Sequence, residues 1–113
     1  VMGHTGCGAV LVTLDHVRSP GQLPGCVSSI VWAITPAARE ATHRAGDDAW
    51  ELAVELNVAA TVARLAESRP TLAGAVERGE LAVVGAVYDL RSGMVRWLTP
   101  APPTPCTADV RTM

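Results

Sequence analysis

The run Leu81–Tyr88, which reads LAVVGAVY, constrains the fold of this chain more than any other feature. Apart from the tyrosine hydroxyl its side chains are apolar, so neither side of an extended strand would offer a polar face to water. Such a strand must be covered on both faces, which is typical of sheets flanked by helices. We therefore predict a buried strand over 81–88 inside an α/β layered fold with a mostly parallel central sheet.

The residues that follow predict an antiparallel edge for this sheet. Residues 89–93 (DLRSG) have turn composition, and residues 94–98 (MVRWL) return as a second strand, so the pair is predicted to form a hairpin at the sheet edge. From residue 99 the sequence TPAPPTP is rich in proline, which can neither join a sheet nor continue a helix. We predict a domain over 1–98 and a Pro-rich tail over 99–113.

Helices are predicted for most of the first eighty residues. A short buried helix opens directly after Cys7, and SPGQLPG (19–25) is an irregular link. An apolar helix follows over 26–34, and Pro36 either ends it or starts the next one. With several helices and few strands, the predicted sheet is short of strands.

The most regular periodicity predicts one long amphipathic helix. Asp47 and Asp48 can cap it, and apolar residues recur about every four positions, as an apolar helix face requires. Gly79 lies where the helical region is expected to end. The apolar positions of the long helix are Trp50, Val54, Val58, Val62 and Leu65.

Composition excludes several classes of protein. The chain has 113 residues, a net charge of −2 and no lysine, and its arginines are scattered, which argues against a nucleic-acid surface. No apolar run approaches the roughly 20 residues of a membrane span, and no leader sequence precedes the fold, so we predict a soluble chain without membrane contact. Three cysteines do not form a disulfide framework, which favours a reducing, cytoplasmic location.

A histidine and a cysteine stand three residues apart in the opening sequence VMGHTGCGAV. A neutral imidazole and a thiolate are ligands that zinc prefers, and a four-coordinate site needs four donors, of which His4 and Cys7 supply two. Glycines at positions 3, 6 and 8 allow a sharp turn, and a thiolate at a helix start is stabilised by the helix dipole. From spacing alone, a metal site and a chance pair in a buried turn both remain open.

The other candidate donors have ordinary structural interpretations. His16, with Asp15 beside it, ends the first helix and is predicted to face solvent, and His43 belongs to a solvated helix face. Cys26 is predicted to be a small core residue, and Cys106 an exposed thiol in the tail. Tyr88 is predicted to be structural, and the tryptophans at 32, 50 and 97 to lie in the core or at a subunit interface.

The opening turn, together with segments of the second half, resembles the β-class carbonic anhydrases. VMGHTGCGAV is similar to the zinc-ligand turn of that family, and the segments 57–58, 65–72, 75–81 and 85–95 match its second half in order and spacing. The resemblance covers roughly residues 1–98 and implies a β-carbonic-anhydrase-like fold whose N-terminal half is missing. That half would supply the central strands and a helical arm that binds a partner subunit, so a homodimer or higher homo-oligomer is expected.

The resemblance also implies a zinc enzyme. In that family two cysteines and one histidine hold Zn²⁺, and zinc-bound hydroxide attacks carbon dioxide to give bicarbonate and a proton. His4 and Cys7 match two of the ligands, with Gly6 and Gly8 as turn glycines around the metal. The third ligand belongs to an upstream Cys-x-Asp-x-Arg motif, whose Asp-Arg pair orients the zinc-bound water or gates the fourth position. This motif is absent here, so no catalytic residue is visible.

Two alternatives accompany this interpretation. The chain could be a non-catalytic carbonic-anhydrase-like module, for instance in a fusion with a transporter, or a zinc hydrolase of a related small electrophile such as carbon disulfide. The segment from Cys106 to Arg111 is similar to the missing motif but has one residue too many between Cys and Asp. We therefore do not assign it a role in zinc binding. As a free unit, the chain would leave a strand edge and apolar faces exposed and is expected to aggregate or to be partly disordered.

Overall fold

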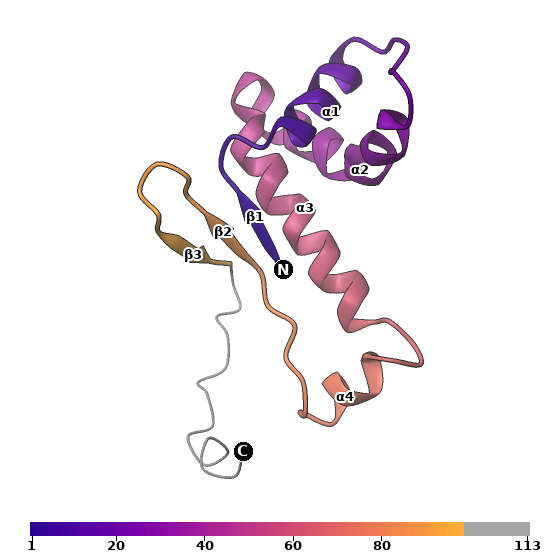
Figure 1. The fold of residues 1–113 in the computed structure, drawn as a ribbon, viewed down its shortest axis with the longest axis vertical. Coiled ribbons are helices and arrows are strands. Elements are labelled where there is room, and N and C mark those ends of the chain that lie inside the picture. Colours follow the sequence, from indigo (N-terminus) through magenta and orange to yellow (C-terminus); the bar gives the residue numbers. More distant parts are fainter. Residues whose placement is uncertain (99–113) are drawn as a thin grey trace.

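A computed structural model describes residues 1–98, which form an α/β fold with a small mixed sheet (Figure 1). The predicted tail over 99–113, with Cys106, lies outside the described residues. In chain order the elements are β1 (Met2–His4), α1 (Gly8–Arg18), α2 (Val27–Ala45), a 3₁₀ turn (Gly46–Asp48), α3 (Ala49–Ala66), α4 (Ala73–Glu77), β2 (Ala86–Tyr88) and β3 (Val95–Trp97).

The sheet has the strand order β1-β2-β3, in which β1 and β2 are parallel and β2 and β3 antiparallel. The predicted hairpin and its antiparallel edge are therefore confirmed. The strand predicted over 81–88 is much shorter than expected, because only Ala86–Tyr88 is paired as a strand and Leu81 is 39% exposed. The reason is pairing: β1 and β3 are three residues long and oppose β2 only at these positions.

Helix α3 covers one face of the sheet, and two glycines set how closely it approaches. A Cβ on Gly3 of β1 would lie 2.7 Å from Val58 Cγ2, and one on Gly85, just before β2, would lie 2.8 Å from Val58 Cγ1. Val54 and Val58 are buried on α3, as the periodicity predicted. The predicted cap is not formed, because Asp48 stands at the N-cap position without a side-chain hydrogen bond.

Helix α2 runs through Pro36, which corrects the prediction of a helix boundary at that residue. The buried residues of α2 lie on both sides of the proline and form one stripe, which packs against α1 and α3. Burial of that stripe outweighs the one helical hydrogen bond that proline cannot make. The stripe consists of Val31, Ile34, Ala37, Ala38 and Ala41.

Several residues predicted to be buried are at the surface of the described chain. Cys26 is exposed in the turn ahead of α2, so its prediction as a core residue was wrong. Trp32 is 77% exposed, Trp97 51% and Trp50 36%, so none of the three lies in the core of residues 1–98. The core instead uses Val10 and Leu14 of α1 with small residues of α2 and α3.

None of the helices in the described part of the chain combines the length and the apolar character that crossing a membrane requires.

The hairpin turn between β2 and β3 is organised by Asp89. Its Oδ1 accepts the backbone N–H of Arg91 at 2.8 Å and that of Ser92 at 3.4 Å. Its own N–H donates to the carbonyl of Met94 at 2.8 Å, which closes the turn. The N–H of Arg91 is the main cause that holds the pKa of the Asp89 carboxyl below its ordinary value of 3.8.

We expect the Asp89 turn to loosen in acid. Because the pKa in the folded chain lies below the unfolded value, the carboxylate stabilises the turn above the unfolded pKa, and this contribution is lost as the pH falls through the folded pKa. An NMR titration of the Arg91 amide should have its midpoint below 3.8. Asp89→Asn keeps an oxygen acceptor and should remove the titration while preserving the hairpin. A midpoint at or above the ordinary value would contradict this assignment.

Candidate metal centre

His4 and Cys7 are placed by the end of β1 and the start of α1. The strand ends at His4, and the N–H of Thr5 donates to the carbonyl of Tyr88 at 3.0 Å, which holds the turn against β2. Gly6 has φ +66°, a left-handed conformation that favours glycine. Cys7 then occupies the N-cap position of α1. The sequence thus brings the two predicted ligands to the carboxyl end of a parallel strand, where α/β proteins commonly bind ligands.

Both residues line one cavity of about 170 Å³. Its floor is formed by β1 and by the face of α3 that carries Asn57, Val58 and Thr61. His4 is exposed and Cys7 is partly buried. Of the two, His4 is therefore the more accessible from solvent.

The tautomer of His4 is fixed by its hydrogen bond. Nδ1 lies 2.9 Å from the carbonyl oxygen of Thr5. Because a carbonyl only accepts, Nδ1 carries the proton in this hydrogen bond, and Nε2 of the neutral imidazole has the lone pair. Histidines that bind metals commonly donate their other ring N–H to a carbonyl in this way. His4 therefore has the tautomer that a metal ligand requires.

Cys7 is held in place through its backbone. The residue occupies the N-cap position of α1, and its side chain makes no capping hydrogen bond. Its carbonyl accepts from Leu11 N at 3.1 Å and from Trp50 Nε1 at 2.9 Å. Trp50, 43 residues away, thus holds the backbone of Cys7 in place, a role that no local spacing could have indicated.

The three glycines of the opening turn have different roles from those predicted. Only Gly6 has a positive φ. A Cβ on Gly8 would meet nothing within 4 Å, so the geometry of residues 1–98 does not require a glycine there. Gly3 is a strand residue that permits close packing of α3 against β1 and does not form part of the turn.

His4 and Cys7 form a pair without a third donor among residues 1–98, where no group of three or more histidines, cysteines or acidic residues is close enough to hold a metal. His16 lies in the last turn of α1, at the opposite end of the helix from Cys7. His43 is exposed on α2, as predicted for a solvated face. The donor types fit a soft or borderline ion such as zinc, and the number of donors fits half of a site.

The free edge of the sheet lies beside this half-site. Along β1, Val1 and Thr5 bond to β2 through their main chains, so the alternating positions Met2 and His4 direct their N–H and C=O groups to the other edge. In the described sheet, no strand pairs with that edge of β1. An unpaired edge of this kind is a template for a further strand.

One face of the sheet is also open beside the half-site. Gly3 faces α3, so its strand neighbours Met2 and His4 lie on the opposite face, in register with Trp97 and Val95 of β3. Met2 is 60% exposed and Trp97 51%. Among residues 1–98, α3 is the helix that packs against β1 and β2, and it covers the other face.

Taken together, these features define an α/β chain with a His–Cys pair at the carboxyl end of a parallel strand and an open sheet edge beside it. A family model described as carbonic anhydrase matches residues 1–95. The carbonic anhydrase of Mycolicibacterium smegmatis is 34% identical over 96 residues, which cover 84% of this chain and 46% of that protein. The chain belongs to the β-class carbonic anhydrase family.

Two solved structures show the same fold over about half of their own length. The β-carbonic anhydrase CcaA matches with a TM-score of 0.72 at 25% identity, covering 93% of this chain and 51% of that one. A mutant of the β-carbonic anhydrase CafD of Aspergillus fumigatus matches with a TM-score of 0.61 at 27% identity, covering 87% of this chain and 54% of that one. The chain therefore spans about half the length of the relatives it matches.

Proposed function

We propose that residues 1–98 are the C-terminal part of a zinc-dependent carbonic anhydrase domain, in which His4 and Cys7 are two of the protein ligands of Zn²⁺. The observation that carries this proposal is that both donors line one cavity, with Nδ1 of His4 engaged by Thr5 and Nε2 left as a lone-pair donor. When bound, zinc would supply an ionised water at neutral pH as the nucleophile for carbon dioxide.

Each neighbouring residue has a defined task in this proposal. The carbonyl of Thr5 holds His4 in the ligating tautomer. Cys7 presents its sulfur from the N-cap position of α1, and Trp50 fixes the backbone at Cys7 through its indole N–H. The apolar wall at Val58 keeps one side of the cavity dry, which strengthens the electrostatic interactions inside it.

The third ligand would come from a segment that pairs with the free edge of β1. A strand added there would run beside His4, and its carboxyl end would reach the cavity if it were parallel to β1. We propose that this strand carries the Cys-x-Asp-x-Arg motif of the family, with the Asp-Arg pair orienting the water. The same half would cover the open face around Met2 and Trp97.

The substrate, the assembly, the location and the division into domain and tail are further parts of this proposal. The substrate pair would be carbon dioxide and bicarbonate, the assembly a homodimer or higher homo-oligomer, and the location cytoplasmic, where Cys7 and Cys26 would remain free thiols as they are in the structure. The division into a domain over 1–98 and a tail over 99–113 is proposed on the proline content of the tail.

The direct test is stopped-flow hydration of carbon dioxide by the full product of the reading frame, purified without added metal. We expect zinc-dependent bicarbonate formation that is lost with a chelator and restored by Zn²⁺. Zinc binding without hydration, but with hydrolysis of carbon disulfide, would support the related-electrophile alternative. Neither zinc binding nor turnover would overturn the proposal in favour of a non-catalytic module.

A further inference from the structure

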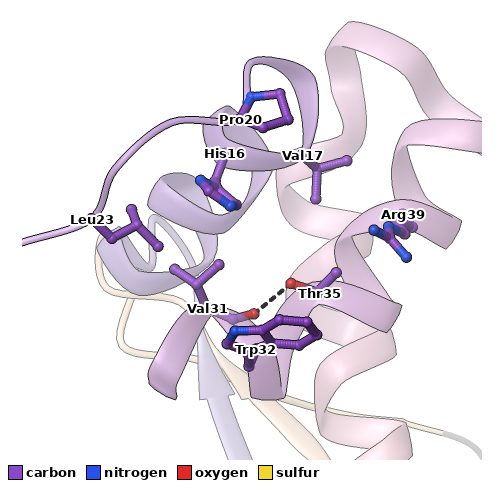
Figure 2. A pocket seen from close by; sticks show the side chains of 8 residues that line it. All are labelled: His16, Val17, Pro20, Leu23, Val31, Trp32, Thr35 and Arg39. Atoms are coloured by element: carbon purple, nitrogen blue, oxygen red, sulfur yellow. Dashed lines mark hydrogen bonds between the residues drawn. The ribbon is translucent and has the colours of Figure 1, made fainter. Parts of the chain in front are cut away.

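A second cavity lies away from the half-site, in a groove between the end of α1 and the middle of α2. It has a volume of about 210 Å³, enough for a small organic molecule. Figure 2 shows side chains from both helices and from the loop between them converging on it. The groove is lined by His16, Val17, Pro20, Leu23, Val31, Trp32, Thr35 and Arg39.

The lining combines an apolar floor with basic and neutral polar groups at its rim. Val17, Leu23 and Val31 form the floor, whereas His16 and Arg39 supply the ionisable groups. No carboxylate lines the groove. A ligand that fills it would therefore be favoured if it combined an apolar body with a negative charge.

Arg39 is the group best suited to recognise that charge. Within residues 1–98 its guanidinium has neither a hydrogen-bond partner nor a salt bridge, whereas the neighbouring Glu40 pairs with Arg44 at 2.9 Å. A guanidinium recognises carboxylates through two parallel N–H donors. The hydroxyl of Thr35 is already used, because it donates to the carbonyl of Val31 at 2.6 Å.

Trp32 supplies the apolar and planar side of the groove. It lies two helical turns from Arg39 on the same side of α2, and 77% of it is exposed in the described structure. An indole face against such a groove favours a flat ring, because offset stacking adds to the burial of apolar area.

We propose that this groove binds a small planar monocarboxylate of the aromatic-acid class, with the carboxylate on Arg39 and the ring against Trp32. The His16 side chain on α1 faces the same groove and can donate a second hydrogen bond (Figure 2). The inference does not depend on zinc or on the proposed activity, because it uses no residue of the half-site.

Benzoate is the probe for the test, titrated into the full reading-frame product while the Trp32 indole N–H is followed by NMR. We expect a saturable shift of that signal and at least about tenfold weaker binding for Arg39→Gln. Trp32→Ala lacks the reporting signal, so its binding is measured by isothermal titration calorimetry, and it should be weaker by a similar factor. Benzamide, which has nearly the same shape without the charge, should bind the wild type more weakly than benzoate by a similar factor. Arg44→Gln, on the same helix outside the groove, is the matched control and should bind benzoate like the wild type.

Three results would overturn the proposal. One is the absence of any shift of Trp32 at high benzoate concentration, whether the open groove does not bind benzoate or another part of the protein covers it. Another is benzamide binding as tightly as benzoate. The third is a benzoate affinity that Arg39→Gln leaves unchanged but Cys7→Ser abolishes, which would place the ligand at the proposed metal centre.

Discussion

If the proposed function holds, replacing Cys7 with serine should remove bound zinc from the domain and lower its carbon dioxide hydration at least about 100-fold, because a neutral hydroxyl is a much poorer zinc ligand than a thiolate. The hydroxyl is close in size to the thiol, and the partly buried position at the start of α1 accepts it, so folding should be preserved. His4→Ala should give the same loss, since it removes the Nε2 donor that the Thr5 carbonyl orients. Zinc per chain and the rate of hydration are measured on the same preparations.

The chain provides a matched control for this experiment. Cys26 is also a free thiol at the N-cap of a helix, but it is exposed and lies in the turn ahead of α2, away from the cavity of Cys7. Cys26→Ser should therefore keep both zinc and activity. Full zinc content in Cys7→Ser, or an equal loss in Cys26→Ser, would show that Cys7 is not a ligand.

Replacing Gly3 with alanine destabilises the fold by about 1–3 kcal/mol, the usual cost of overpacking. The new methyl group would lie 2.7 Å from Val58 Cγ2 and 3.0 Å from Val54 Cγ1. Both valines are buried on α3 and β-branched, so neither can rotate away at low cost. To relieve the contact, β1 must move away from α3, which also moves His4. Urea unfolding of wild type and variant measures the difference in free energy.

Gly8 and Val58 supply the controls for the Gly3 prediction. A Cβ on Gly8 meets nothing within 4 Å, and alanine is the better helix former, so Gly8→Ala should change the free energy of unfolding little or raise it. The double variant, with alanine at both position 3 and position 58, should be destabilised by less than the sum of the two single changes. In this variant the methyl group at position 3 no longer meets Val58 Cγ2. Additive effects, or equal costs at Gly3 and Gly8, would contradict the packing described here.

Parts of the fold that depend on local sequence could be predicted. The turn at Asp89–Gly93 and the long helix through Val54 and Val58 follow from turn composition and periodicity, and the structure confirms both. The continuation of α2 through Pro36 depends on packing against α1 and α3, which no local pattern contains. The length of β2 depends on its partners, since an apolar run forms a strand of the sheet only where another strand pairs with it.

In the candidate site, too, features set by local sequence could be predicted, whereas contacts between distant residues could not. The residue types and the spacing of His4 and Cys7 left a chance pair open, and the resemblance to the family favoured a pair of ligands; the structure places both residues on one cavity. The hydrogen bond from Trp50 to Cys7 and the role of Gly3 connect residues that are distant in sequence, so spacing could not reveal them. The wrong prediction of Cys26 as a core residue has a local cause, because the residue precedes α2 and does not share the helix's buried stripe.

Zinc content per chain tests the central claim most directly. The claim is that His4 and Cys7 form half of a zinc site that another half of the domain completes at the free edge of β1. The 113-residue chain and the full product of its reading frame are purified without added metal and analysed for zinc. The account predicts about one zinc per chain in the full product and almost none in the 113-residue chain, since two donors make a poor site. A full product without zinc, or a 113-residue chain that holds one zinc by itself, would contradict it.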